Sequence, residues 1–193
     1  MNRRSTIAIF DFDGTLTKHD TFFPFLIHCF GVKSFIKGII LNSPYLVLYF
    51  FKLYPNYKAK QKLIRFFFSK KDINQMKKCA NSFVKDKMKN NIRKGAIKRF
   101  LWHKKMGHTT ILISASLELY ISIWGGEYGF DYVEGTKLKL FKSKYTGEIN
   151  GLNCYGTEKV TRLKKIFGED FSNNLTYGYG DGSGDRFFLE KCN

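Results

Sequence analysis

Two carboxylates stand close together at the end of an apolar stretch near the start of the chain. Residues 7–10 read Ile-Ala-Ile-Phe, and Asp11, Phe12, Asp13 and Gly14 follow directly. Side chains two positions apart in a strand point to the same side, so we expect Asp11 and Asp13 to project together. Neighbouring carboxylates repel each other unless a cation lies between them, and carboxylate oxygens are typical ligands of Mg²⁺. The spacing therefore indicates a magnesium site; the alternative is an ordinary acidic turn.

Three further groups of polar side chains could complete such a site. Ser114 follows an apolar run, Lys159 lies at the expected start of a helix, and a glycine-rich loop carries Asp181 and Asp185. A hydroxyl and an ammonium group can stabilise a phosphoryl group, and loop carboxylates can bind a cation. Each residue also has a structural interpretation: Ser114 could cap a strand end, Lys159 could be solvated, and the loop could be a simple turn.

In their order along the chain, these motifs resemble those of the haloacid dehalogenase-like (HAD) phosphatases. The match rests on DFDGT at residues 11–15, the hydroxyl of Ser114, the lysine in the segment CYGTEKV, and GDGSGD at residues 180–185. The resemblance implies that Asp11 is the nucleophile that forms an aspartyl-phosphate, and that Asp13 is the general acid and base. It also implies that Ser114 hydrogen-bonds a phosphoryl oxygen and that Lys159 neutralises developing charge.

The same resemblance implies Mg²⁺ as the cofactor. Its expected ligands are Asp11, the backbone carbonyl of Asp13, and Asp181, with Asp185 supporting the metal site from behind. Asp13 favours phosphatase action, because HAD members without a second acid at this spacing, such as the dehalogenases, do other chemistry. The family often has Ser or Thr where Gly182 stands here, so we expect a looser metal loop.

Alternating strand and helix patterns must position these residues. We predict strands at residues 7–10, 109–113, 132–140 and 175–179, and helices at residues 97–103, 117–124 and 158–167. Residues 144–149 are predicted to return as a hairpin with Gly147 in its turn. Repeated strand–helix units indicate an α/β fold with a parallel sheet, whose active-site loops lie at the carboxyl ends of the strands. The resemblance implies a Rossmann-like HAD core made of residues 1–18 and 96–193.

Residues 19–95 depart from this alternation, and the resemblance implies that they form an inserted all-α cap. We expect Asp20 or Thr21 to cap a helix start, and a pair of apolar helices broken near Asn42-Ser43-Pro44. The longest uncharged run, residues 38–51, is shorter than the roughly 20 residues that span a bilayer. Two or three amphipathic helices should follow between residues 57 and 95. The apolar helices could form ordinary cap core or lie in a membrane interface.

The chain of 193 residues has 33 Lys and Arg against 16 Asp and Glu, a net charge of +17. Residues 19–95 hold 16 of these basic residues and three of the acidic ones. Such a segment favours a polyanionic partner, meaning nucleic acid, anionic lipid or a phosphorylated substrate, or else is a solvated basic surface. Nucleic acid is the least favoured of these partners, because the sequence has no helix-turn-helix, zinc-finger or RNA-recognition motif.

Cysteine usage and the amino terminus bear on localisation. Cysteines 29, 79, 154 and 192 show no metal-ligand spacing, so we predict four free thiols in a reducing compartment. Residues 1–6 are too short and polar for a signal peptide. The prediction is a cytoplasmic protein, with peripheral contact at the inner face of the membrane as an option.

Within the HAD phosphatases, the resemblance is closest to the phosphoserine phosphatase-like branch. Residues 20–26, the aromatic basic cap and residues 154–159 are similar to the bacterial group that contains phosphatidylglycerophosphatase C. The predicted function is a Mg²⁺-dependent phosphomonoester hydrolase, with a phospholipid head-group phosphate as one candidate substrate. The alternatives are a small soluble phosphoester such as phosphoserine and, from another class, a nucleic-acid-binding or non-catalytic scaffold protein.

Overall fold

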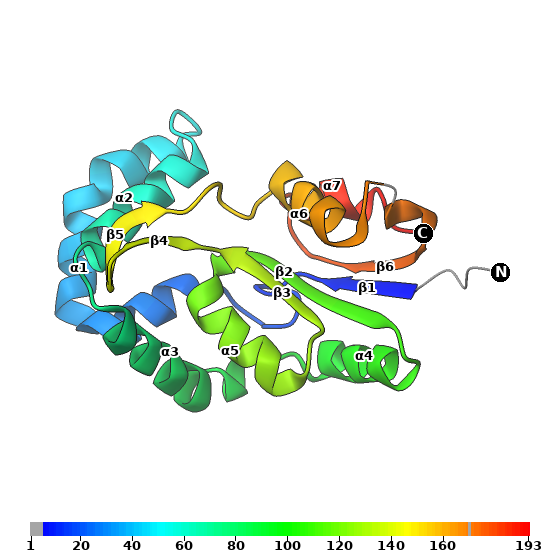
Figure 1. The fold of residues 1–193 in the computed structure, drawn as a ribbon. Coiled ribbons are helices and arrows are strands. Elements are labelled where there is room, and N and C mark those ends of the chain that lie inside the picture. Colours follow the sequence, from blue (N-terminus) through cyan, green and yellow to red (C-terminus); the bar gives the residue numbers. More distant parts are fainter. Residues whose placement is uncertain (1–5, 170) are drawn as a thin grey trace.

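A parallel sheet of four strands forms the centre of the molecule. The computed structural model describes residues 6–169 and 171–193. The strand order is β3–β2–β1–β6 (Figure 1), with β1 at Thr6–Phe10, β2 at Thr109–Leu117, β3 at Tyr132–Thr136 and β6 at Leu175–Tyr179. All three strand pairings are parallel. A parallel sheet of apolar strands requires helices on both of its faces, and the structure provides them.

The two sides of β1 face different helical layers. Ala8 and Phe10 pack with side chains of α4 (Lys94–Lys105) and α5 (Glu118–Tyr128). Ile7 and Ile9 pack instead with side chains of α6 (Thr157–Phe167) and α7 (Arg186–Leu189). Figure 1 shows the two pairs of helices on opposite sides of the sheet. The predicted α/β core with a parallel sheet is therefore confirmed, and all four strands end at the same edge.

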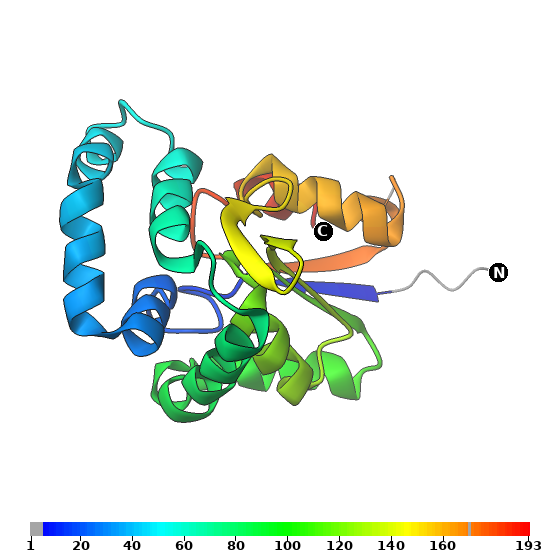
Figure 2. The same ribbon diagram turned by 60° about the vertical axis from the view of Figure 1, so that its left-hand side comes forward.

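A group of helices lies beyond this edge. It consists of α1 (Phe22–Phe50), α2 (Asn56–Phe68) and α3 (Ile73–Lys87), followed by the short 3₁₀ helix at Lys89–Asn91. The chain leaves and re-enters the core at one place, because the Lys18 N–H donates to the Asn91 carbonyl and the Arg93 N–H donates to the Leu16 carbonyl. We call α1 to α3 the cap. A hairpin from the core, β4 (Leu138–Phe141) and β5 (Lys144–Ile149), packs against α2 (Figure 2).

The break in α1 differs from the prediction. Its helical geometry is interrupted at Gly31, which has φ 78° and ψ 157°, and the helix continues through Pro44. Proline removes the N–H that would donate to the Ile40 carbonyl. The Ser43 hydroxyl donates to that carbonyl instead, at 2.8 Å, so the helix tolerates the proline. The predicted break near residues 42–44 is therefore wrong, and a glycine with positive φ makes the break.

Helix α1 also changes the expectation about membrane-spanning length. By length and composition alone it is long and apolar enough to cross a membrane. Only 17% of its most apolar window is buried in the protein, so most of that window is not covered by other parts of the described chain. The uncharged run of residues 38–51 was too short by itself. Helix α1 is longer than this uncharged run because it starts at Phe22 and includes the charged residues Lys33 and Lys37.

Two glycine positions also differ from the prediction. The hairpin turns at Lys142 and Ser143, while Gly147 lies inside β5, where an added Cβ would approach the Arg65 Cα to 3.0 Å. The helix predicted at residues 117–124 does not end before the glycines at 125 and 126 but continues to Tyr128, and Gly129, with φ 84°, follows its end. An added Cβ at Gly125 would lie 2.7 Å from Val133 Cγ2, so glycine there allows α5 to pack closely on β3.

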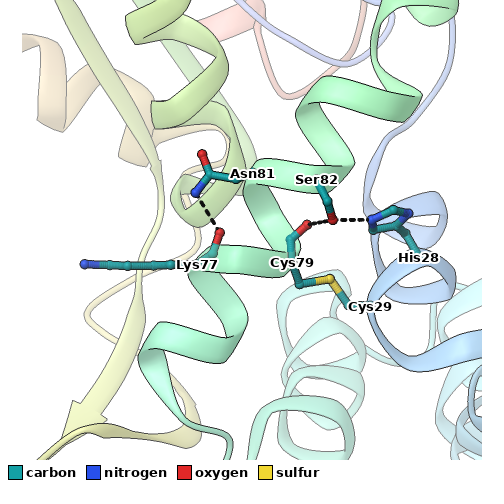
Figure 3. Close-up of a disulfide and its surroundings, with 6 residues drawn as sticks. All are labelled: His28, Cys29, Lys77, Cys79, Asn81 and Ser82. Atoms are coloured by element: carbon teal, nitrogen blue, oxygen red, sulfur yellow. Dashed lines mark hydrogen bonds between the residues drawn. A yellow bond between two sulfur atoms is a disulfide. The ribbon is translucent and has the colours of Figure 1, made fainter.

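Two of the four cysteines are joined. Cys29 in α1 and Cys79 in α3 form a disulfide across 50 residues of sequence (Figure 3). Cys154 and Cys192 are free. The neighbouring His28 Nε2 lies 2.7 Å from the Ser82 hydroxyl, so a second contact joins the same two helices. The prediction of four free thiols is wrong for this pair, which removes the basis for inferring a reducing compartment from cysteine usage.

Candidate active site

A buried lysine links two carboxylates at the carboxyl edge of the sheet. Lys159 Nζ lies 2.6 Å from an oxygen of Asp11, just after β1, and 2.6 Å from an oxygen of Asp185. The lysine side chain is 2% exposed. Burial alone would lower the pKa of Lys159, but the two carboxylates raise it above its ordinary value. The side chain therefore stays positively charged where a charged group could otherwise not persist.

Asp11 lies in a setting that opposes its own charge. Burial raises the pKa of Asp11 to about 6, although the Lys159 ammonium acts in the opposite direction. The nearby Asp185 carboxylate adds repulsion and raises the pKa further. A cation at this position would favour the ionised form, which is the nucleophilic form of a carboxyl group.

The loop after β6 is shaped by Asp185. One of its oxygens accepts the Lys159 ammonium, and the other accepts the N–H groups of Asp181 and Gly182, at 3.2 and 3.1 Å. Gly14 allows this loop to approach closely, because an added Cβ would lie 2.0 Å from an oxygen of Asp181. At Gly182 the nearest atom to an added Cβ is 3.8 Å away, so this position has room for a side chain.

The carboxylates of Asp11, Asp181 and Asp185 converge. One oxygen of each lies within 4.8 Å of the others. Three carboxylate oxygens are a donor set that suits a hard divalent cation such as Mg²⁺. Because both oxygens of Asp185 already accept hydrogen bonds, we expect Asp11 and Asp181 to bind the cation directly and Asp185 to orient the loop. Asp13 contributes no side-chain oxygen to this cluster.

The Asp13 carboxylate is held by hydroxyl groups instead. One oxygen accepts the backbone N–H and the hydroxyl of Thr21, at 2.9 and 2.7 Å, and the other accepts the Ser116 hydroxyl. The Tyr120 hydroxyl lies 2.8 Å from the Ser116 hydroxyl and 2.9 Å from that of Thr21. Burial raises the pKa of Asp13 to about 7, with help from the Asp20 charge, while the hydrogen bonds lower it. A carboxyl group that titrates near neutrality can donate a proton and later accept one.

Sequence reasoning did not identify these three hydroxyl residues as part of the site. Thr21 was expected only as a possible helix cap, but the Asp20 carboxylate accepts the Phe22 N–H at 2.9 Å and leaves the Thr21 hydroxyl to Asp13. Ser116 could have been found as a second hydroxyl two residues after Ser114. Nothing in the sequence marks Tyr120, whose role depends on how α5 packs against the start of α1.

A cavity of about 460 Å³ contains all six predicted site residues. These are Asp11, Asp13, Ser114, Lys159, Asp181 and Asp185. Ser114 is buried, and its hydroxyl accepts the Ser116 N–H at 3.1 Å. The opposite wall belongs to the cap and is mainly apolar, with side chains from α1 and α2: Phe22, Phe23, Leu46, Tyr49, Ala59 and Leu63.

One cap lysine also reaches into this cavity. Lys60 of α2 donates to the Ala115 carbonyl at 2.5 Å and to the Asn153 side-chain oxygen at 3.1 Å. Burial lowers the pKa of Lys60 to about 8. Its contacts join α2 to the end of β2, so the cap meets the core beside the catalytic cavity. Lys60 and Lys159 both line this cavity, so the cap and the core each contribute an amino group to it.

Comparisons with known proteins agree with this geometry. The haloacid dehalogenase-like hydrolase family model matches residues 8–190. Protein CicA of Caulobacter vibrioides is 32% identical over 191 residues, which is 98% of this chain and 84% of that protein. A Bordetella pertussis protein of unknown function superposes with a TM-score of 0.83 at 18% identity, covering 97% of this chain and 87% of that one.

The fold is also that of phosphoserine phosphatases. A phosphoserine phosphatase described as a phospho-aspartyl intermediate analogue has a TM-score of 0.63 at 20% identity, covering 98% of this chain and 84% of its own. At this level of identity the likeness concerns the fold alone. It agrees with the predicted arrangement of a HAD core with a helical cap inserted after the first strand.

Proposed function

Because the chain belongs to the haloacid dehalogenase-like hydrolase family, we propose that it is a phosphomonoesterase that uses Mg²⁺ and a covalent aspartyl-phosphate. The observation that carries the proposal is the Lys159 bridge between Asp11 and Asp185, with Asp181 beside it. This arrangement joins a nucleophile, a fixed positive charge and a cation site in one cavity. These are the components that phosphoryl transfer requires.

Each residue has a defined part in the proposed reaction. The Asp11 carboxylate attacks phosphorus, and the bond from phosphorus to the leaving oxygen breaks while Asp13 donates its proton to that oxygen. In the second step Asp13 accepts a proton from a water molecule, whose oxygen attacks phosphorus and releases Asp11 and inorganic phosphate. Lys159 and Ser114 stabilise the phosphoryl oxygens throughout.

Asp11, Asp181 and the Asp13 carbonyl would hold the Mg²⁺ ion, and Asp185 would support the metal loop from behind. Bound there, the cation would neutralise charge on the phosphoryl oxygens. The lysine alone leaves the three carboxylates of the cluster with a net negative charge, which supports a divalent cation as the remaining component.

The test is hydrolysis of p-nitrophenyl phosphate with Mg²⁺ and with EDTA. We expect turnover with Mg²⁺ and its loss in EDTA, restored by added Mg²⁺. The Asp11→Asn variant should remain folded and lose turnover, because it keeps the shape of the side chain but not the nucleophile. Undiminished turnover in EDTA, or in Asp11→Asn, would contradict the proposal.

For the substrate we propose a phosphate on a phospholipid head group. The apolar cap wall of the cavity and the basic residues of the cap support an amphiphilic phosphate ester. A small soluble phosphoester such as phosphoserine is the second candidate, favoured by the phosphoserine phosphatase fold. Comparison of kcat/KM for phosphatidylglycerophosphate, glycerol 3-phosphate and phosphoserine distinguishes the two. Localisation in the cytoplasm, at the inner face of the membrane, stays a prediction.

A further inference from the structure

The second half of α1 has an apolar face that no other part of the described chain covers. After Gly31, the exposed apolar residues recur at helical spacing and continue into the following turn; we call this set the outer face: Val32, Ile36, Ile40, Val47, Phe50, Phe51 and Leu53. Ile40 is 64% exposed and Phe50 is 80% exposed. A surface helix of a water-soluble protein normally presents polar residues on this side. An apolar face of this extent indicates an interaction surface.

The opposite side of the same helix packs against α2. An added Cβ at Gly38 would lie 2.5 Å from the Phe67 ring of α2, so the two helices touch closely there. Asn42 is buried on this side, and its amide donates to the Gly38 carbonyl at 2.8 Å. Figure 2 shows α1 as the outermost element, with α2 between it and the sheet. The outer face therefore points away from the rest of the molecule.

The charge around the outer face has one sign. Residues 21–71 include nine Lys or Arg and no Asp or Glu. Lys33 and Lys37 lie near the start of the outer face and Lys52 near its end, and all three are exposed. In the described part of the chain, none of these three lies within ion-pair distance of a carboxylate. Exposed lysines beside exposed aromatic and aliphatic side chains complement a surface that is both anionic and apolar.

We propose that the outer face docks the protein on an anionic lipid bilayer. The helix lies in the interface, with the apolar side chains among the acyl chains and the three lysines at the head groups. It does not cross the bilayer, because α2 is packed along it and carries Lys58 and Arg65, which would be drawn into the hydrocarbon. Nucleic acid would leave the apolar side chains uncovered, so a lipid surface fits better.

The docked orientation would bring the catalytic cavity to the lipid head groups. Leu46 and Tyr49 belong to the same half of α1 and line the cavity that holds Asp11. One side of the helix therefore contacts the membrane while a neighbouring side forms the wall of the site. This part of the inference rests on the proposed phosphatase function, whereas the docking itself can be measured without any turnover.

The experiment is co-sedimentation of the intact protein with vesicles of phosphatidylglycerol and phosphatidylcholine, and with vesicles of phosphatidylcholine alone. We expect binding to the anionic vesicles and much weaker binding to the neutral ones. A basic residue near such a surface changes the partition coefficient about fivefold, so the two reversals in Lys33→Glu/Lys37→Glu should weaken binding by at least about 20-fold. Phe50→Glu/Phe51→Glu should weaken it by more than about tenfold, also at high salt.

Matched controls lie on α4 and directly after it, at the opposite end of the molecule in Figure 1. Leu101 of α4 and Met106, the residue that follows α4, are exposed apolar residues, and Lys98 and Lys105 of α4 are exposed lysines. Leu101→Glu/Met106→Glu and Lys98→Glu/Lys105→Glu make the same chemical changes and should leave vesicle binding within about twofold of the parent protein.

Three outcomes would overturn the docking proposal. The first is that the protein does not bind anionic vesicles. The second is that the α1 variants and the control variants lose vesicle binding equally. The third is that the protein forms a lipid-free dimer, which Phe50→Glu/Phe51→Glu converts to monomer, while vesicles fail to bind. Hydrolysis of p-nitrophenyl phosphate by the same preparations separates this proposal from the enzymatic one. Vesicle binding without turnover refutes the phosphatase function alone, and turnover without vesicle binding refutes docking alone.

Discussion

Thr21 offers a direct test of how Asp13, the proposed general acid, is positioned. Replacing it in Thr21→Val removes one hydroxyl, at 2.7 Å from the Asp13 carboxylate, and keeps the size and branching of the side chain. The backbone N–H of residue 21 and the Ser116 hydroxyl still donate to Asp13. The change therefore loosens the carboxyl group without removing it, and the Tyr120 hydroxyl keeps its contact with Ser116.

The expected effect depends on the leaving group. A hydrogen bond to a charged group contributes about 1.5–3 kcal/mol, which corresponds to a factor of roughly 10 to 150 in rate if all of it is lost in the transition state. An alkyl phosphate such as glycerol 3-phosphate needs a proton on its leaving oxygen, whereas p-nitrophenolate leaves without one. Thr21→Val should therefore lower kcat/KM by about 10- to 150-fold for the alkyl ester and by less than about threefold for p-nitrophenyl phosphate.

The assay is kcat/KM for both esters, since this parameter reports the step that phosphorylates Asp11 and excludes the later hydrolysis. Thr21→Ser should recover most of the alkyl-ester activity, because it restores the hydroxyl. In an Asp13→Asn background Thr21→Val should have no further effect. An equal loss for the two esters would refute the positioning argument and leave Thr21 with a merely structural part.

Three further predictions concern stability and the metal loop. Lys159→Met should abolish turnover and lower the free energy of unfolding by about 3 kcal/mol, because two buried carboxylates lose their partner. Urea titration measures this change, and an unchanged unfolding midpoint would contradict the Lys159 bridge between Asp11 and Asp185. Gly14→Ala should abolish Mg²⁺-dependent turnover measured with p-nitrophenyl phosphate, while Gly182→Ser should retain it. An added Cβ at Gly14 collides with Asp181, whereas at Gly182 its nearest neighbour is 3.8 Å away. Reduction, or the double change Cys29→Ser/Cys79→Ser, should lower unfolding stability by about 4 kcal/mol, and alkylation with mass spectrometry should find the pair protected until reduced.

Much of the core could be predicted from sequence because its signals are local. The buried strands appear as short apolar runs, and the helix at residues 157–167 has its apolar residues on one side. Both patterns can be recognised from a few neighbouring residues. The acids, Ser114 and Lys159 belong to motifs whose spacing reflects the chemistry they share. The structure places all of them in one cavity, which follows from parallel strands that end at one edge.

The errors arose where one particular contact, local or distant, overrides the usual behaviour of a residue. Pro44 normally breaks a helix, but a hydroxyl one residue earlier satisfies the carbonyl that the proline leaves free. The Cys29–Cys79 pair spans 50 residues, and only the packing of α1 against α3 brings the two sulfurs together. Thr21 was assigned to helix capping because that is the usual use of a threonine at this place, and its contact with Asp13 depends on the entry angle of α1.

The two halves of α1 have separable tasks, and Gly31 is the reason. The first half begins beside Thr21, which hydrogen-bonds the Asp13 carboxylate, and Cys29 fastens this half to α3. The second half carries the outer face and changes direction at Gly31, where an added Cβ would meet no atom within 4 Å. A change on the outer face is therefore not transmitted to Asp13 through one continuous helix, because the helical geometry is interrupted at Gly31 and the disulfide fastens the first half to α3. Variants of the outer face should therefore leave kcat on p-nitrophenyl phosphate unchanged, even where they abolish vesicle binding. A parallel loss of both would show that the halves move as one rod.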